Sequence, residues 1–279
     1  MPVARTAVVS LGVLLAAACG GGGGDVIVAT TTSTVDSGLL DALVPVFERE
    51  TGYHVKYVGV GSGAALEMAK RGDADAALAH APDAERELET KGVVVNRRLV
   101  MHNDFILVGP PDDPAGVRAA GRATEALLAI AASGATFISR GDNSGTHQLE
   151  LRHWQRAGVD PSSGAEYVES GQGMGPTLQL ASARRAYTLT DRGTYLALRD
   201  TLDLAPLFEG DPALLNVYHV MQVNPERFPE VNAEGAQAWV EFLVSVEAQR
   251  IIGSFGVVRL GQALFTPDAG KTEAALGLE

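Results

Sequence analysis

The stretch SRGDNSGTHQLEL, residues 139–151, joins a short β-rich run to what reads as the first turns of a helix. It delivers a permanent cation, two hydroxyl groups and a flexible glycine to that helix start, in Arg140, Ser144, Thr146 and Gly145. A helix start has backbone N–H groups without intrahelical partners and carries the positive end of the peptide dipoles. A polar loop with one N-cap residue would show the same pattern. This stretch alone therefore does not predict a site for a small anion. Similar polar residues at the ends of other strands would support one.

Asp142 lies two residues after the arginine, where a carboxylate would repel a bound anion. We expect it to pair with Arg140 and to hold the guanidinium in position. The arginine would then present a rigid fork of donors that matches a tetrahedral oxyanion.

The composition is that of an ordinary globular protein, with 279 residues, 46% hydrophobic and 20% charged, in one large or two medium domains. The formal net charge of -12 argues against nucleic acid as a partner. It does not exclude a small anion, because charges are screened over about 10 Å and local donors decide the affinity. The single cysteine, Cys19, excludes a disulfide framework and a thiolate metal cluster.

The N-terminus has the pattern of a signal peptide rather than of a folded element. One positive residue, Arg5, precedes an apolar run at 7–18 that is too short to span a membrane. The run ends in LAAAC, residues 15–19, which resembles a bacterial lipobox, although Ala16 stands where leucine is commoner. We expect residues 1–24 to be a signal peptide with lipidation at Cys19 and a flexible glycine linker, in an extracytoplasmic protein. The alternative is an unmodified cysteine after a cleavable signal.

The rest of the chain alternates between short strands and amphipathic helices, which predicts an α/β fold with parallel-rich sheets. Such sheets bind ligands outside the carboxyl ends of their strands. A final long helix is expected over 235–253, with Trp239, Phe242 and Val246 among the residues on its core side. Strands are expected within 26–29, 54–60, 74–80, 98–110, 136–139, 166–170, 184–191 and 216–223.

Two of these strands are long enough to cross between lobes, at 98–110 and 216–223. We expect one lobe from residues 25–106 together with 212–279, a second lobe from 107–211, and a ligand cleft between them.

Further hydroxyl or glycine-rich junctions follow other strands, and each alone would be a loop with a helix cap. They are TTTST at 30–34, GSG at 61–63 and GQGMGPT at 171–177. Because all of them lie where a strand gives way to a helix, they can converge with the arginine stretch.

Six stretches together carry a family resemblance: ATTTST at 29–34, GSG at 61–63, LAHAP at 78–82, MHNDF at 101–105, RGDNSGTH at 140–147 and LTDRGTY at 189–195. Over nearly its whole mature length the chain resembles the extracytoplasmic tungstate-binding proteins of ABC importers. That resemblance implies the two-lobed periplasmic-binding-protein fold of type II. It also implies a monomer that holds its oxyanion without metal or cofactor and delivers it to a membrane permease, with no bond made or broken.

The resemblance implies the ligand-binding residues as well. The first lobe would contribute Thr31, with Thr32 and Ser33 beside it, and Ser62 with Gly63. The second lobe would contribute Arg140 and Thr146, supported by the remaining members of the set, which are Ser144, Gly145, Gly173 and Met174.

Two alternatives within the fold stay open, molybdate and phosphate. Molybdate is a tetrahedral dianion of nearly the same size as tungstate, so the sequence does not separate them. A protonated phosphate needs an acceptor, which a carboxylate in the cleft would supply. Asp75 is the candidate for that role, and we expect it to face away and to pair or cap locally.

A serine hydrolase is the alternative from another class. Ser62 and Ser144 are each flanked by glycine, but neither lies in a G-x-S-x-G motif, and the histidines show no triad order. His80 is expected to be structural, because its neighbours supply no second metal ligand.

Overall fold

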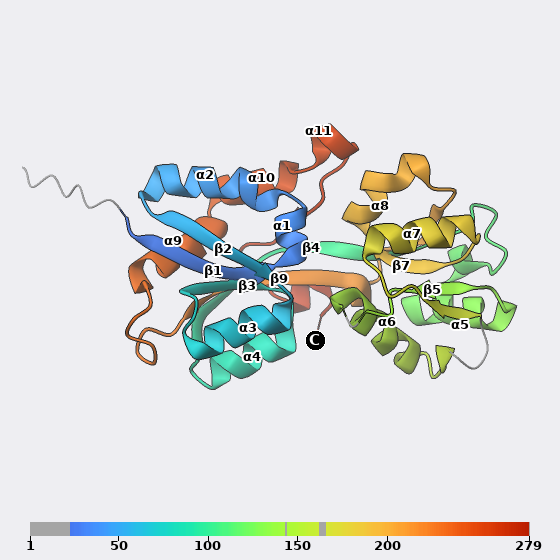
Figure 1. Cartoon of the computed structure of the whole chain (residues 1–279), viewed down its shortest axis with the longest axis horizontal. Coiled ribbons are helices and arrows are strands. Elements are labelled where there is room, and N and C mark those ends of the chain that lie inside the picture. The colour runs from blue at the N-terminus through green and yellow to red at the C-terminus, as the bar shows by residue number, and fades with distance from the viewer. Residues whose placement is uncertain (1–22, 143, 162–165, 279) are drawn as a thin grey trace, which may run out of the picture.

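The computed structural model describes residues 23–142, 144–161 and 166–278. Figure 1 shows two bodies side by side, with two long strands running between them. We call the body built on β1, β2 and β3 the first lobe, and the body built on β5, β6 and β7 the second lobe. The predicted alternation of strands and helices is confirmed.

The strands are β1 (Asp25–Thr31), β2 (His54–Val60), β3 (Ala76–Ala79), β4 (Val94–Gly109), β5 (Phe137–Ser139), β6 (Tyr167–Glu169), β7 (Thr188–Asp191), β8 (Ala205–Phe208), β9 (Leu215–Val223) and β10 (Thr266–Pro267). The α-helices are α1 (Thr32–Asp36), α2 (Leu39–Thr51), α3 (Ser62–Arg71), α4 (Pro82–Thr90), α5 (Ala123–Ser133), α6 (Gly145–Arg156), α7 (Met174–Ala183), α8 (Arg192–Leu198), α9 (Ala233–Leu243), α10 (Val246–Ser254) and α11 (Val257–Leu260). Short 3-10 helices are η1 (Val117–Ala119), η3 (Arg199–Thr201), η4 (Pro212–Leu214) and η5 (Ala274–Leu276).

The sheet of the first lobe has the strand order β10-β4-β9-β3-β1-β2. Strand β1 runs parallel to β2 and to β3, so the carboxyl ends of these three strands lie at one edge. The long strands run antiparallel to their neighbours, β9 to β3 and β4 to β9. The parallel pairing that we predicted therefore holds for β1, β2 and β3, and the crossing strands add an antiparallel part.

Strand β4 changes its partners midway. Its first part pairs with β9 as far as Asp104, which lies opposite Leu215. From Phe105, opposite Asp191, it pairs with β7 and then with β8. Strand β4 thus belongs to both lobes, and β9 returns beside it to the first lobe (Figure 1).

The second lobe also has parallel strands that end at one edge. Strands β5 and β6 are parallel, and Phe137 forms a parallel bridge to Tyr187 just before β7. Its core packs Phe137 edge-on against Trp154, with ring centroids 5.2 Å apart. The first lobe packs Phe47 against Trp239 in the same way, at 5.0 Å.

The predicted helix over 235–253 is wrong in one respect, because two helices occupy that range. Helix α9 ends at Leu243, and Ser245 starts α10 by accepting a hydrogen bond from the backbone N–H of Ala248. Val246, which we expected in the core, lies at the start of this second helix and points into solvent, with 88% of its surface exposed. The Ser245 side chain caps a new helix here, although the apolar residues on both sides continue with the spacing of a single helix.

Candidate functional site

Three strand exits of the first lobe meet at one edge of its sheet, because β1, β2 and β3 are parallel. Helix α1 follows β1 directly, with Thr31 at the N-cap position, and α3 begins at Ser62 with Gly61 at its N-cap. The Thr31 side chain accepts no capping hydrogen bond from α1 in the described chain, and Gly61 has no side chain with which to cap α3. Unsatisfied backbone donors at both helix starts are therefore available to an acceptor.

A chain of hydroxyl groups lies at the end of β1. Thr31 Oγ1 is 2.7 Å from Thr34 Oγ1 and 3.1 Å from Ser33 Oγ. Thr31 and Thr34 are buried, whereas Thr32 and Ser33 are exposed. Ser33 is thus the point at which a buried hydroxyl network reaches the surface of the first lobe.

The hydrogen bonds between hydroxyl groups continue from Ser33 to side chains on the crossing strands, which were not among the predicted site residues. Ser33 Oγ lies 3.0 Å from the hydroxyl of Tyr218, which is fully buried on β9. The Asn216 amide donates to that hydroxyl at 2.8 Å and to Asn103 Oδ1 on β4 at 2.9 Å. Asn216 and Tyr218 lie two positions apart in the extended run at 216–223, and so on one face of a strand, which is the signal that could have indicated these two residues.

Ser62 is linked to the exit of β3, because its Oγ accepts a hydrogen bond from the backbone N–H of His80 at 3.3 Å. The His80 ring packs against Tyr218 with 4.9 Å between ring centroids. Burial lowers the pKa of His80 to about 4, although the charge of Glu85 works in the opposite direction, so the imidazole is neutral at neutral pH. A side chain at Gly63 would meet no atom within 4 Å, which leaves open space beside Ser62.

In the second lobe, the loops after β5 and β6 are joined at Arg140. The carbonyl of Arg140 accepts hydrogen bonds from the backbone N–H of Gly171 at 2.9 Å and from Ser170 Oγ at 3.1 Å. Gly141 has a φ of 61°, and a Cβ there would come within 2.5 Å of Glu169 Cβ. Glycine is required at this point because the backbone must approach the neighbouring strand closely.

Arg140 pairs with Asp142, as we predicted: Arg140 Nη2 donates to Asp142 Oδ2. Asp142 Oδ1 also accepts from the backbone N–H of Ser144 at 3.1 Å. The pKa of Asp142 is lowered, because the Ser144 hydrogen bonds and the Arg140 charge outweigh the opposing effect of burial. The carboxylate is therefore ionised and fixes the guanidinium to the start of α6.

Arg140 retains a donor for another group. Its Nε is buried and has no hydrogen-bond partner within residues 23–142, 144–161 and 166–278. A buried charged donor without a partner is costly, and an anion at this place would satisfy it.

The starts of α6 and α7 lie beside Arg140. Ser144 caps α6 by accepting from the backbone N–H of His147 at 3.3 Å, and its side chain also hydrogen-bonds to the Asp142 carboxylate. Thr146 is mostly buried, and Gly145 is exposed. Gly173, at the N-cap of α7, leaves that helix start without a side-chain cap, and the Met174 side chain is buried in the core, so Met174 can offer a ligand only backbone groups.

The two lobes meet at these helix starts. A Cβ built on Gly145 of α6 would lie 3.5 Å from Cε1 of His80 in the first lobe. In the described parts of the chain, no hydrogen bond joins Arg140 to Thr31, Ser33 or Ser62. The structure thus brings the sequence-predicted residues to two facing surfaces, which are not tied together by direct bonds between those side chains.

Asp75 lies away from these surfaces, as we expected. Its Oδ2 accepts from the backbone N–H of Ile27 and its Oδ1 from that of Asn232, both at 2.6 Å. Both carboxylate oxygens therefore have structural partners.

Glu150 is a buried acid that the sequence analysis missed. It is 2% exposed and accepts hydrogen bonds from Ser139 at 2.8 Å, from Tyr167 at 2.8 Å and from Trp154 at 3.2 Å. Burial raises its pKa to about 7, against the effect of these hydrogen bonds. Because Ser139 Oγ also accepts from the backbone N–H of Gly141 at 3.2 Å, Glu150 supports the loop that carries the arginine.

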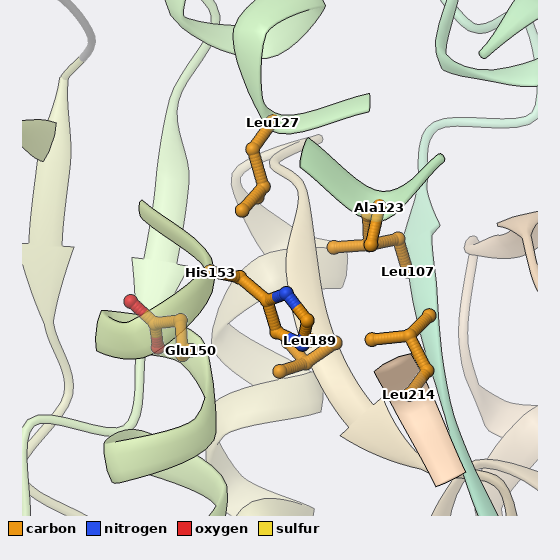
Figure 2. Close-up of a pocket in the computed structure, with 7 residues that line it drawn as sticks. All are labelled: Leu107, Ala123, Leu127, Glu150, His153, Leu189 and Leu214. Carbon is orange, nitrogen blue, oxygen red and sulfur yellow. The ribbon is translucent and has the colours of Figure 1, made fainter. Parts of the chain in front are cut away.

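A cavity of about 10 Å³ lies elsewhere, in the second lobe. Figure 2 shows His153 at its centre, among leucines and Ala123, with Glu150 at one side. A space of this size holds about one water molecule, so a tetrahedral oxyanion does not fit.

The described residues contain no group of three or more His, Cys, Asp or Glu side chains that could hold a metal ion. None of the helices in the described part of the chain is both long and apolar enough to cross a membrane. The predicted signal segment and lipidation site at Cys19 lie outside the described residues.

Two lobes joined by crossing strands, with helix starts, hydroxyls and an arginine facing each other at the junction, define the class of two-lobed solute-binding proteins. Residues 16–247 match the family model of the PBP superfamily domain. The chain is 47% identical to the tungstate-binding protein TupA of Peptoclostridium acidaminophilum, over 86% of this chain and 84% of that protein.

Two solved structures are similar as well. The tungstate-binding protein TupA from Desulfovibrio alaskensis G20 is 42% identical, with a TM-score of 0.82 over 88% of this chain and 99% of that one. The tungstate ABC transporter structure from Geobacter sulfurreducens is 48% identical, with a TM-score of 0.71 over 83% of this chain and 98% of that one. The chain therefore belongs to the PBP superfamily and, within it, to the family of tungstate-binding proteins TupA.

Proposed function

We propose that this protein captures tungstate at the junction of its two lobes and delivers it to the permease of an ABC importer. The observation that carries this proposal is Arg140, which Asp142 holds at the start of α6 and whose buried Nε lacks a partner in the described chain. A tetrahedral dianion would satisfy that donor and the unsatisfied N–H groups of the neighbouring helix starts.

The proposed ligand contacts come from both lobes. Thr31, Thr32 and Ser33 would bind from the end of β1, and Ser62 with Gly63 from the start of α3. Arg140 and Thr146 would bind from the second lobe, with Ser144 and the backbone at Gly145, Gly173 and Met174 as further donors.

The polar groups at this junction favour an anion that accepts hydrogen bonds and donates none. Asp75 is engaged by two backbone N–H groups in the first lobe, and Asp142 is engaged by Arg140 and Ser144. A protonated phosphate would find neither carboxylate free to accept its hydrogen, which costs binding energy. This supports tungstate over phosphate, whereas molybdate presents the same acceptors.

The lobes proposed for this function are residues 25–106 with 212–279 and residues 107–211. The change of β4 partners between Asp104 and Phe105 supports a boundary close to the first of these limits. We further propose an extracytoplasmic monomer, tethered to the membrane through a lipid on Cys19, in which residues 1–24 are processed and linker segments.

Isothermal titration of the protein with tungstate, molybdate, sulfate and phosphate tests the function. We expect tungstate to bind much more tightly than sulfate and phosphate. Phosphate binding as tight as tungstate binding would contradict the proposal. Assays with acyl esters address the hydrolase alternative, and we expect no turnover.

A further inference from the structure

Ser33 reaches the first-lobe surface from a hydrogen-bond chain that begins in the crossing strands. Asn216, on β9, uses both hydrogens of its amide nitrogen: one goes to Asn103 Oδ1 at 2.9 Å and the other to the Tyr218 hydroxyl at 2.8 Å. Since Tyr218 accepts from Asn216, its own O–H can donate to Ser33 Oγ, which lies 3.0 Å away.

The Tyr218 hydroxyl stays protonated, and so able to donate, at physiological pH. Tyr218 is fully buried, between the ring of His80 at 4.9 Å and that of Phe265 at 5.9 Å. Burial raises the pKa of this phenol, and the nearby charge of Asp191 raises it further. The phenol therefore keeps its proton.

Ser33 Oγ has two lone pairs and one hydrogen. Tyr218 donates to one lone pair, and Thr31 Oγ1, at 3.1 Å, can donate to the other, because Thr34 can in turn donate to Thr31 at 2.7 Å. In this arrangement both lone pairs are occupied, and Ser33 has only its O–H left for a ligand.

We propose that Tyr218 is a specificity-determining residue that acts through Ser33, by keeping that serine a donor and so excluding oxyanions that carry a proton. The inference rests on the proposed function, since it assumes that the oxyanion binds beside Ser33. Tyr218 itself does not touch the ligand and is a positioning residue. Asn216 sets its direction, and Asn103 holds Asn216.

The Tyr218→Phe variant tests this inference, because it removes the hydroxyl and keeps the ring that packs against His80 and Phe265. In the variant one lone pair of Ser33 becomes free to accept a hydrogen from the ligand. Affinities for tungstate, sulfate and phosphate are measured by titration, or by competition against tungstate, at about pH 8, where phosphate is mainly a dianion with one proton.

We expect tungstate affinity to fall about three- to tenfold, as for the loss of one neutral hydrogen bond. The ratio of phosphate affinity to sulfate affinity is expected to rise at least about threefold, because only phosphate gains an acceptor. Tyr187→Phe is the matched control: it removes a phenol hydroxyl that contacts Ala115 and Asp113 in the second lobe. It should change neither quantity.

Asn216→Asp is a second, nearly isosteric variant. An aspartate cannot donate to Tyr218 and would instead accept its proton, which turns the hydroxyl away from Ser33. Its added charge weakens all three dianions, but the phosphate-to-sulfate ratio should again rise.

Equal losses for all three anions in Tyr218→Phe, or no change at all, would overturn the inference, since a purely structural role predicts one of these results. Wild-type protein that fails to bind tungstate would contradict the proposed function instead. If Tyr218→Phe does not fold, an unchanged ratio in Asn216→Asp overturns the inference.

Discussion

Arg140 brings a positive charge to the loop that precedes α6 in the second lobe. Its Nη2 is committed to Asp142, whereas its buried Nε has no partner among the residues that the structure describes. Binding energy should therefore depend more on this residue than on any hydroxyl group of the opposite surface.

We expect Arg140→Ala to weaken tungstate binding by roughly 1.5 to 3 kcal/mol, and Ser62→Ala or Thr31→Ala by about 1 kcal/mol each, because charge-assisted hydrogen bonds are the stronger ones. Calorimetric titration measures these losses. Arg140→Lys should lie between wild type and Arg140→Ala, since it keeps the charge and loses the fork. Arg49→Ala, on the exposed face of α2, is the control and should bind as wild type. Equal losses from Arg140→Ala and Ser62→Ala would refute the assignment.

Glu150 is a second residue with a measurable consequence. Its pKa is about 7 in the folded protein, mainly because of burial, against an ordinary value of 4.5. Between these pH values the unfolded chain releases the proton and the folded protein keeps it. The free energy of unfolding should therefore fall as pH rises through this window, by on the order of 3 kcal/mol, and stay level above it.

Glu150→Gln mimics the protonated acid and keeps the three hydrogen-bond partners. We expect this variant to lose the decrease between about pH 4.5 and 7, and to be more stable than wild type above that window. Urea unfolding at a series of pH values provides the measurement, with Glu89→Gln on the exposed side of α4 as the control. Parallel curves for Glu150→Gln and wild type would show that Glu150 does not titrate in this range.

At the scale of elements, the sequence predicted the helices and strands that can be recognised from the spacing of neighbouring residues. Alternation gave the ranges of β1 and β2 to within a few residues. Asp142 was assigned to Arg140 correctly because both partners lie in one loop. The partners of Ser33 could not be predicted in the same way, because Tyr218 is 185 positions away and meets it only after β9 returns to the first lobe.

The break between α9 and α10 shows the limit of periodicity. Leucine and valine continue through 243–246, and only Ser245 marks the interruption. The burial of Glu150 was not predicted, because an acid in an amphipathic helix normally lies on the solvent side. Its buried carboxylate is stabilised by hydrogen bonds from Ser139, Trp154 and Tyr167.

Ser245→Ala should lower stability by about 1 kcal/mol, because the backbone N–H of Ala248 loses its acceptor. Ser245→Asp keeps an acceptor at the same place and should stay close to wild type. Thermal unfolding followed by circular dichroism distinguishes them. A Ser245→Ala protein as stable as wild type would indicate that packing of α10, rather than the cap, starts this helix.

At the scale of the whole molecule, starts of helices from both lobes lie at the junction. Helix starts of the first lobe face Arg140 and the start of α6, and Gly145 approaches His80 closely. Positive ends that face each other repel, and a dianion between them reverses that repulsion. The closed arrangement should therefore be stabilised by the ligand, and the ligand-free protein should open by bending where β4 and β9 cross between the lobes.

We expect tungstate to reduce the radius of gyration of the protein in small-angle X-ray scattering. Gly145→Leu tests the contact at which the lobes meet: a Cβ at this position already lies 3.5 Å from His80 Cε1, so a longer side chain has to displace the ring or hold the lobes apart. This variant should fold normally, bind tungstate more weakly and show a smaller decrease in radius. A substitution at Gly134, the exposed end of α5, is a control for the loss of glycine, and Gly134→Asn suits its φ of 70°. If the wild-type radius is the same with and without tungstate, the ligand does not close the lobes, and the repulsion between the two surfaces is too weak to open them.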